Sequence, residues 1–207
     1  MRLYFVPNDP ERTTLMSANG VIHYQVTTVK ARRFTPAILR IKRPAIDAEE
    51  DTCVAEVKWK RGFRAHPVVR SHIFDGEMQE LQVRHFLYKV GRLFSPTRYF
   101  LGSDDEEYRW KPLKDTGHVL THVSSSREVA RFVQETVTEG FFQGEKKWCL
   151  FIQPTNLDID MIVVSFIIME KRRRDRIAAE GMKTKNQDED RAVEGGCETG
   201  GSGGALA

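Results

Sequence analysis

The sequence predicts a mainly β domain, and two observations lead to this fold class. Short segments rich in β-branched and aromatic residues recur up to about residue 155, separated by Gly, Pro, Asn and Asp turn signals. Several of these segments alternate apolar and polar residues with a period of two, which is typical of strands with one buried face. With 207 residues and 40% hydrophobic content, the chain is long enough for one such domain with a substantial core.

Four regions carry the strand prediction in chain order. Residues 21–30 follow an Asn-Gly turn signal, and residues 37–42 form a second run that ends before a proline. In residues 53–60 apolar and charged side chains alternate, so that one face consists of Cys53, Ala55, Val57 and Trp59. Residues 98–111 contain two alternating arms around a polar Gly-Ser-Asp-Asp-Glu loop, a pattern that predicts a hairpin.

Residues 128–137 fit two structures. Ser125 lies three residues before Glu128, which is the spacing of a helix capping box. Apolar residues then recur at helical intervals at Val129, Phe132, Val133 and Val137. The β-branched residues of the same stretch equally suit a strand. The local pattern therefore leaves this segment open between helix and strand.

Residues 160–176 join an apolar block directly to a cluster of cations. As a helix, the nine residues 161–169 would extend only about 14 Å, roughly half the hydrocarbon thickness of a bilayer, which excludes a membrane span. The block is apolar on every side except at Ser165, so it must be buried on every side. Its β-branched content alone favours an interior strand.

The composition of the chain changes after residue 176. Residues 177–207 contain three Lys or Arg and six Asp or Glu, a net charge of −3, which leaves +6 for residues 1–176. The C-terminal segment is also glycine-rich and poor in large apolar side chains, so it cannot offset the entropy of ordering. We therefore predict a folded domain over residues 1–176 and a disordered acidic tail over residues 177–207.

Sequence motifs for catalysis and for metal binding are absent. The chain lacks the nucleophile-elbow, P-loop, dinucleotide-binding and zincin motifs. His118 and His122 have the spacing of a helical metal pair, but no third ligand accompanies them. Three scattered cysteines without a CxxC spacing suit a reducing compartment, and no signal peptide is recognisable. We predict a cytoplasmic, non-enzymatic protein without metal or cofactor.

Two strand-like segments each place cations on the face opposite an aromatic residue, Trp59 in one and Trp110 in the other. These cations are Lys58, Lys60, Arg109 and Lys111. If the two segments lie near each other in a sheet, the cations form a patch that could hold phosphoinositide headgroups or other anions. The alternative is a solvated face on which Glu56 and Glu107 neutralise the cations across strands.

The order of five segments is distinctive. They are IHYQVTT at 22–28, VAEVKWK at 54–60, EEYRWKPL at 106–113, VARFV at 129–133 and DIDMIVVSFIIMEKRRRDR at 158–176. In this order the chain resembles an uncharacterised fungal (mushroom-type) domain of unknown function that is similar to the tubby C-terminal and LURP-one-like barrels.

The resemblance implies a closed antiparallel β-barrel of about twelve strands around a hydrophobic C-terminal helix. Closure would remove the exposed edges that many short strands otherwise leave. The resemblance also makes residues 129–133 a strand and the apolar block a helix. The core residues of that helix are then Met161, Ile162, Val164, Phe166, Ile167 and Ile168.

Tubby-like relatives bind phosphoinositides on the barrel exterior, so the resemblance implies a binding module in the cytoplasm or at the inner surface of a membrane, with an anionic phospholipid as ligand. We expect the protein to be a monomer. The candidate residues are Lys58, Lys60, Arg109, Lys111, Lys171, Arg172 and Arg173. Two alternatives are a protein–protein interaction module and an enzyme with a barrel-surface pocket. Nucleic acid ranks last as a partner, because the basic cluster at 171–176 is small and lacks interleaved aromatic residues.

Overall fold

The computed structural model describes residues 1–30, 36–45, 50–59, 66–74, 76, 78–91, 95–113 and 117–194, with side chains described as far as Gly181. The chain divides into two units, Met1–Glu170 and Lys171–Ala207. Lys60, one of the predicted ligands, lies outside the described residues.

The first unit is built on a single antiparallel sheet. Its strands are β1 (Arg2–Val6), β2 (Thr13–Met16), β3 (Ile22–Val29), β4 (Ala37–Arg43), β5 (Thr52–Trp59), β6 (Val68–Ser71), β7 (Gln79–Gln82), β8 (Arg98–Leu101), β9 (Glu107–Leu113), β10 (Gly117–His122), β11 (Glu128–Thr136) and β12 (Lys146–Ile152). They are hydrogen-bonded in the order β7-β6-β5-β4-β3-β2-β1-β12-β11-β10-β9-β8. The sheet therefore consists of two meanders that meet where β1 pairs with β12.

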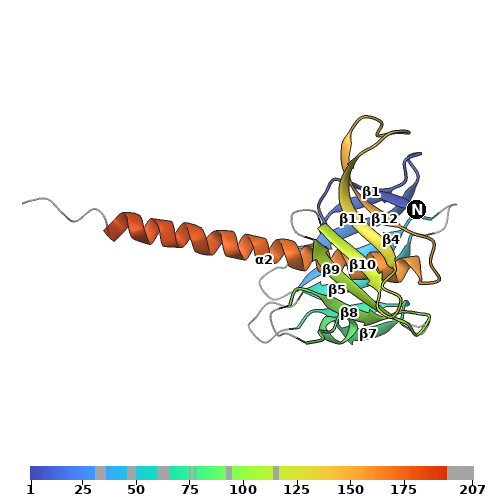
Figure 1. Cartoon of the computed structure of the whole chain (residues 1–207), viewed down its shortest axis with the longest axis horizontal. Coiled ribbons are helices and arrows are strands. Elements are labelled where there is room, and N and C mark those ends of the chain that lie inside the picture. The colour runs from blue at the N-terminus through green and yellow to red at the C-terminus, as the bar shows by residue number, and fades with distance from the viewer. Residues whose placement is uncertain are drawn as a thin grey trace, which may run out of the picture. The chain divides into compact units, whose positions relative to one another are not determined.

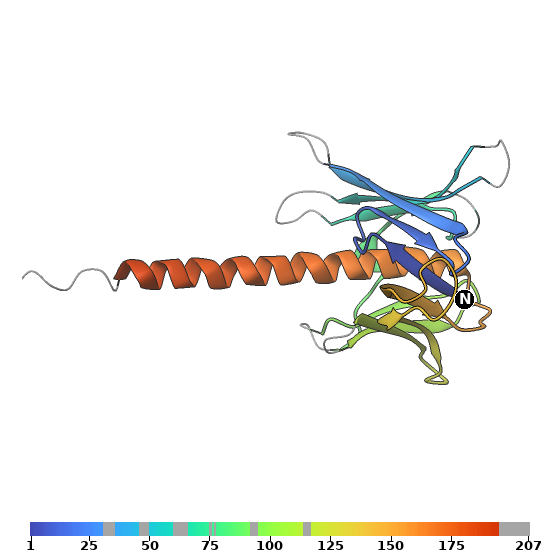
Figure 2. The same ribbon diagram turned by 90° about the horizontal axis from the view of Figure 1, so that it is seen from above.

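The sheet curves around the beginning of the long helix α2 (Ile159–Glu194), whose first turns lie between strands of the two meanders (Figures 1 and 2). The two ends of the sheet, β7 and β8, do not pair with each other in the described part of the chain. Between them lies the short helix α1 (Val83–Phe86). After it, Tyr88 exchanges two hydrogen bonds of 2.9 Å with Tyr99 of β8. A mainly β fold of twelve strands with a C-terminal helix is thus confirmed, whereas hydrogen-bonded closure is not observed.

The apolar block forms the first turns of α2, although its β-branched residues favour a strand. Every residue from Met161 to Glu170 is buried. Inside a curved sheet, a strand would leave its backbone N–H and C=O groups without partners, while a helix satisfies them internally. The helix start is capped by Asp158, whose carboxylate accepts a hydrogen bond of 2.9 Å from the backbone N–H of Asp160. All six residues predicted for the core helix are buried here.

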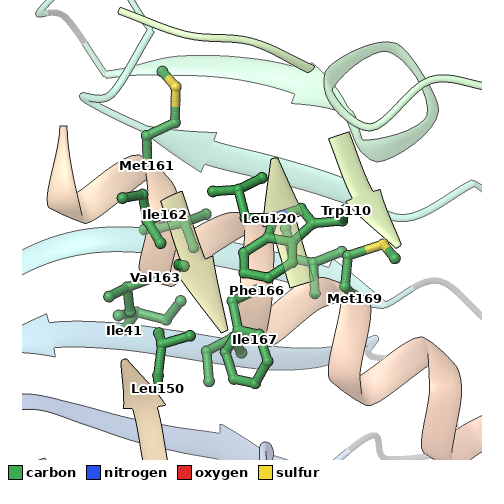
Figure 3. Packing of buried hydrophobic residues seen from close by; sticks show 14 of the residues in the cluster. Ile41, Trp110, Leu120, Leu150, Met161, Ile162, Val163, Phe166, Ile167 and Met169 are labelled. Atoms are coloured by element: carbon green, nitrogen blue, oxygen red, sulfur yellow. The ribbon is translucent and has the colours of Figure 1, made fainter. Parts of the chain in front are cut away.

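Phe166 of α2 lies at the centre of the core (Figure 3). Its ring packs against Phe132 with a centroid distance of 4.6 Å, against Phe5 at 5.5 Å and against Trp110 at 5.6 Å. These partners come from β11, β1 and β9, so one helical side chain connects both meanders. Aromatic pairs of this geometry contribute about 0.5–1.5 kcal/mol each beyond their buried area.

Ser165, the one polar residue of the apolar block, has a structural role. Its hydroxyl accepts a hydrogen bond of 2.9 Å from the indole N–H of Trp110 and donates one of 3.0 Å to the carbonyl of Ile162. Both side chains are fully buried. A buried tryptophan N–H needs an acceptor, and Ser165 supplies it.

Substitution Ser165→Ala should lower the free energy of unfolding by about 1–3 kcal/mol, because it leaves the Trp110 N–H buried without an acceptor. Guanidinium denaturation measures this loss. In a double-mutant cycle with Trp110→Phe, the combined loss should fall short of the sum of the single losses. Strict additivity would contradict the role of this hydrogen bond.

The ambiguous segment is a strand, as the resemblance implied. β11 pairs with β10 on one side and with β12 on the other. Ser125 does not cap a helix, since its hydroxyl lies 2.7 Å from Nδ1 of His122 within a turn. Pairing on two sides outweighs the local helical pattern.

The disordered tail over residues 177–207 stays a prediction. α2 continues to Glu194, and residues 195–207 lie outside the described part of the chain. Residues 177–194 include several Ala, Glu, Lys, Arg and Met residues, which have high intrinsic helix propensity. Within the described residues, neither helix has the length and apolar character needed to cross a bilayer.

Candidate anion-binding surface

The predicted cations lie on strands that are not neighbours. Lys58 belongs to β5, which pairs with β4 and β6, whereas Arg109 and Lys111 belong to β9, which pairs with β8 and β10. The condition for a joint patch, adjacency of the two segments in the sheet, is therefore not met.

The face around Lys58 is neutralised by acidic residues. Arg40, Glu56, Arg70 and Glu80 lie opposite one another across β4, β5, β6 and β7, so that positive and negative charges alternate. Arg40 Nε lies 2.7 Å from Glu56 Oε1, and Lys58 Nζ lies 3.2 Å from Glu80 Oε2. Charges on this face are therefore neutralised, but by other pairs than the alternative interpretation named, because Glu56 pairs with Arg40 and Lys58 pairs with Glu80.

Another row of residues crosses the outer face of the sheet between β9 and β1. Directly opposite one another on β9, β10, β11, β12 and β1 are Lys111, Val119, Arg131, Phe151 and Arg2. We call these five residues the cationic row. Its three cations are exposed and lie on alternate strands, hence about 10 Å apart at a strand spacing of about 4.8 Å.

The charges of the cationic row are only partly compensated. Arg131 forms a two-pronged ion pair with Glu128, with N–O distances of 2.5 and 3.0 Å. Arg2 lies 3.5 Å from Glu135, and its guanidinium stacks 5.2 Å from the ring centroid of Phe151. Lys111 makes no ion pair with any of the residues that the structure describes. Among the described residues, the row thus offers one cation without an ion pair and two cations that pair with surface carboxylates.

Arg109 adds a further cation beside the row. It pairs with Thr121 in the register of β9 and β10, next to the Lys111–Val119 position. Its Nε is buried and has no hydrogen-bond partner among the described residues. Of the predicted ligands, Arg109 and Lys111 therefore join a positive surface, but their companions are Arg131 and Arg2.

A cleft of about 410 Å³ adjoins the Arg2 end of the cationic row. Arg2, Tyr4, Glu135 and Phe151 contribute to its walls. The Tyr4 hydroxyl donates a hydrogen bond of 3.2 Å to Glu135, and burial raises the pKa of Tyr4 to about 12. Tyr4 therefore stays protonated at neutral pH. Its hydroxyl proton is donated to Glu135.

The remaining predicted ligands, Lys171, Arg172 and Arg173, belong to the second unit. Lys171 is buried, and its Nζ lies 3.1 Å from Asp175 Oδ1. Burial lowers the pKa of Arg172. Lys171 is thus engaged within its own helix, at the i,i+4 spacing.

Two observations concern metal ligands and cysteine reactivity. Nowhere in the described ranges do three or more His, Cys, Asp or Glu side chains gather as metal ligands. Cys149 is fully buried, and burial raises the pKa of its thiol to about 12, which keeps it from being an effective nucleophile at neutral pH.

The comparisons with known proteins point to one family. The model of a family of unknown function (DUF6593) matches residues 8–175. The chain belongs to this family. No curated protein and no solved structure matches. The DUF6593 match contains four residues of the cationic row, Lys111, Val119, Arg131 and Phe151, while Arg2 lies before its start.

Proposed function

We propose that this protein is a non-enzymatic binding module that is recruited to anionic membrane lipids, phosphoinositides among them, at the cytoplasmic face of a membrane. The cationic row carries this proposal, because its three exposed cations lie along one line on the outer face of the sheet. Phe151 and Val119 lie between the cations and provide apolar contact.

We also infer that the sheet acts as a closed barrel of the tubby C-terminal type. The two hydrogen bonds between Tyr88 and Tyr99 tie the segment after α1 to β8. On the other side, the N–H of Val83 at the start of α1 donates to the carbonyl of Pro67, just before β6. The α1 segment would then connect the two ends of the sheet in place of direct hydrogen bonds between β7 and β8, and it would keep the outer face of the sheet rigid.

The electrostatic attraction expected from the row is modest. A Lys or Arg close to an anionic membrane surface contributes about 1 kcal/mol, and the pairs with Glu128 and Glu135 reduce this contribution for two of the three cations. Binding through the row alone should therefore be weak, reversible and strongly dependent on salt.

We predict that vesicles of phosphatidylcholine with added phosphatidylserine or phosphoinositide recruit the protein at about 0.15 M salt more strongly than pure phosphatidylcholine vesicles do. Vesicle co-sedimentation measures this difference. The double substitution Arg2→Gln with Lys111→Gln should weaken binding by about tenfold, since it removes two exposed cations.

A matched control is Arg40→Gln with Lys58→Gln, which removes the same charge from the neutralised face of β4 and β5. This control should change vesicle binding less than about twofold. Equal losses for the two double variants would mean that only the net charge matters. Equal recruitment by both kinds of vesicle would contradict recognition of anionic lipid.

A further inference from the structure

Phe141 is the most exposed of the large hydrophobic side chains that the structure describes, with 74% of its surface accessible. It lies in the loop between β11 and β12. Val21 and Ile22, at the β2–β3 turn, are 50% and 39% exposed. We call these three residues the apolar tip.

The two loops of the apolar tip are fixed to each other. The backbone N–H of Phe141 donates a hydrogen bond of 2.7 Å to the carbonyl of Ala18 in the β2–β3 turn. Gly140 has a φ of +84°, and a Cβ at this position would come within 2.2 Å of the Ala18 oxygen. The close approach of the loops therefore requires glycine at position 140.

The residues beneath the apolar tip belong to a small cluster of buried side chains. Phe142, the neighbour of Phe141, is only 4% exposed and belongs to a second apolar cluster with Tyr4, Val137 and Cys149. Lys147 Nζ lies 4.9 Å from the centroid of the Phe142 ring. The loop is thus anchored beside Phe141 while the Phe141 ring itself is exposed, which favours a function in contact with an apolar medium.

The position of the tip relates it to the cationic row. Its base rests on Tyr4 and Cys149, which lie two residues along β1 and β12 from Arg2 and Phe151. Both features therefore belong to the same outer face of the sheet. Near the tip, Glu145 forms an ion pair with Lys147, and the charge of Glu139 is balanced by that of Lys146. The net charge of these four residues is zero, so we expect the tip to contact a membrane through its apolar side chains.

We propose that the apolar tip inserts into the boundary between headgroups and acyl chains of the bilayer that the cationic row contacts. The inference rests on the proposed function of the row and gives it the second signal that stable membrane attachment requires, because a single weak signal yields only marginal binding. The bilayer is favoured over a protein groove by the adjoining cations and by the protrusion of Phe141 from its loop.

The test uses the full chain and vesicles of phosphatidylcholine with phosphatidylserine, at about 0.1 M and at about 1 M salt. Phe141→Ala should weaken vesicle binding by about tenfold at both salt concentrations, since apolar contact is not screened. Leu101→Ala, which removes a side chain that is 54% exposed on β8, should leave binding unchanged. The Arg2→Gln, Lys111→Gln variant should lose affinity at the lower salt concentration only.

Phe141→Trp provides a direct reporter of insertion. Its fluorescence emission, measured as the difference from the wild-type protein with its three tryptophans, should shift to the blue on these vesicles and be quenched by brominated acyl chains.

Unchanged emission together with unimpaired binding of Phe141→Ala would overturn the proposal for the apolar tip and leave the proposal for the cationic row intact. Loss of binding in Phe141→Ala without any effect of the row variant would overturn the row and leave the tip intact. If wild-type protein binds neither anionic nor neutral vesicles, both proposals fail.

Discussion

A chain that ends at Ile159 is expected to lose cooperative unfolding altogether. It lacks the eight apolar side chains of α2 that are at most 5% exposed, namely Met161, Ile162, Val163, Val164, Phe166, Ile167, Ile168 and Met169. Burial of such a side chain contributes about 1.5–3 kcal/mol, so their joint contribution of about 12–24 kcal/mol matches or exceeds the usual stability of a whole domain, about 5–15 kcal/mol. Thermal unfolding followed by near-ultraviolet circular dichroism measures the loss.

The control is a chain that ends at Arg176, which keeps every buried residue of α2 that the structure describes. It should unfold cooperatively, within a few degrees of the full chain. A soluble fragment 1–159 with a sharp melting transition would show that the sheet has a core of its own, and it would contradict the central position of the helix.

Phe166→Ala should be the most damaging of the single substitutions considered, with a loss of about 3–5 kcal/mol in the free energy of unfolding. The ring packs against Phe5, Trp110 and Phe132, and these come from strands of both meanders. The surrounding sheet can collapse only partly into the vacated space, so a cavity remains. Guanidinium denaturation with an unchanged m-value measures the loss.

Phe141→Ala serves as the matched control for the same change of side chain. Because Phe141 is 74% exposed, this variant should stay within about 0.5 kcal/mol of the wild-type stability. A loss below about 1 kcal/mol for Phe166→Ala would contradict the packing around α2.

Much of the sheet follows from the local sequence, because strands with one buried face show a period of two. The residues of β5 illustrate both the success and its limit. Ala55 and Val57 are buried as the alternation predicts, but Val54, which lies between Cys53 and Ala55, is buried too. A bulge causes this, since Ile41 lies opposite Ala55 while Lys42 lies opposite Cys53. Bulges depend on the partner strand and leave no signal in the period itself.

The helix and β11 could not be assigned from their own residues. The block at 161–169 is buried on all sides, which removes the polar face that would reveal a helical period. β11 has spacing that suits a helix, and only its pairing with β10 and β12 decides for a strand. Both assignments came from the resemblance, which carries information about the whole fold.

The cationic row could not be predicted from the sequence for a different reason. It joins Arg2 to Phe151 through the β1–β12 pair, and these residues lie at opposite ends of the first unit's sequence. The sequence pointed to Lys111 and Arg109 through their alternation with Trp110, but it linked them to Lys58 because the two segments look alike. Similar local patterns do not determine which strands become neighbours.

The most direct test of the proposed membrane contact compares two lysines of the same sheet. Lys111 belongs to the cationic row, and Lys58 lies on the neutralised face beside Glu80. A lysine-reactive reagent is applied to the protein alone and to the protein on phosphatidylserine-containing vesicles, and modification is quantified by mass spectrometry. We predict that the vesicles protect Lys111 and leave Lys58 as reactive as before. Protection of Lys58 equal to or greater than that of Lys111 would contradict the proposal.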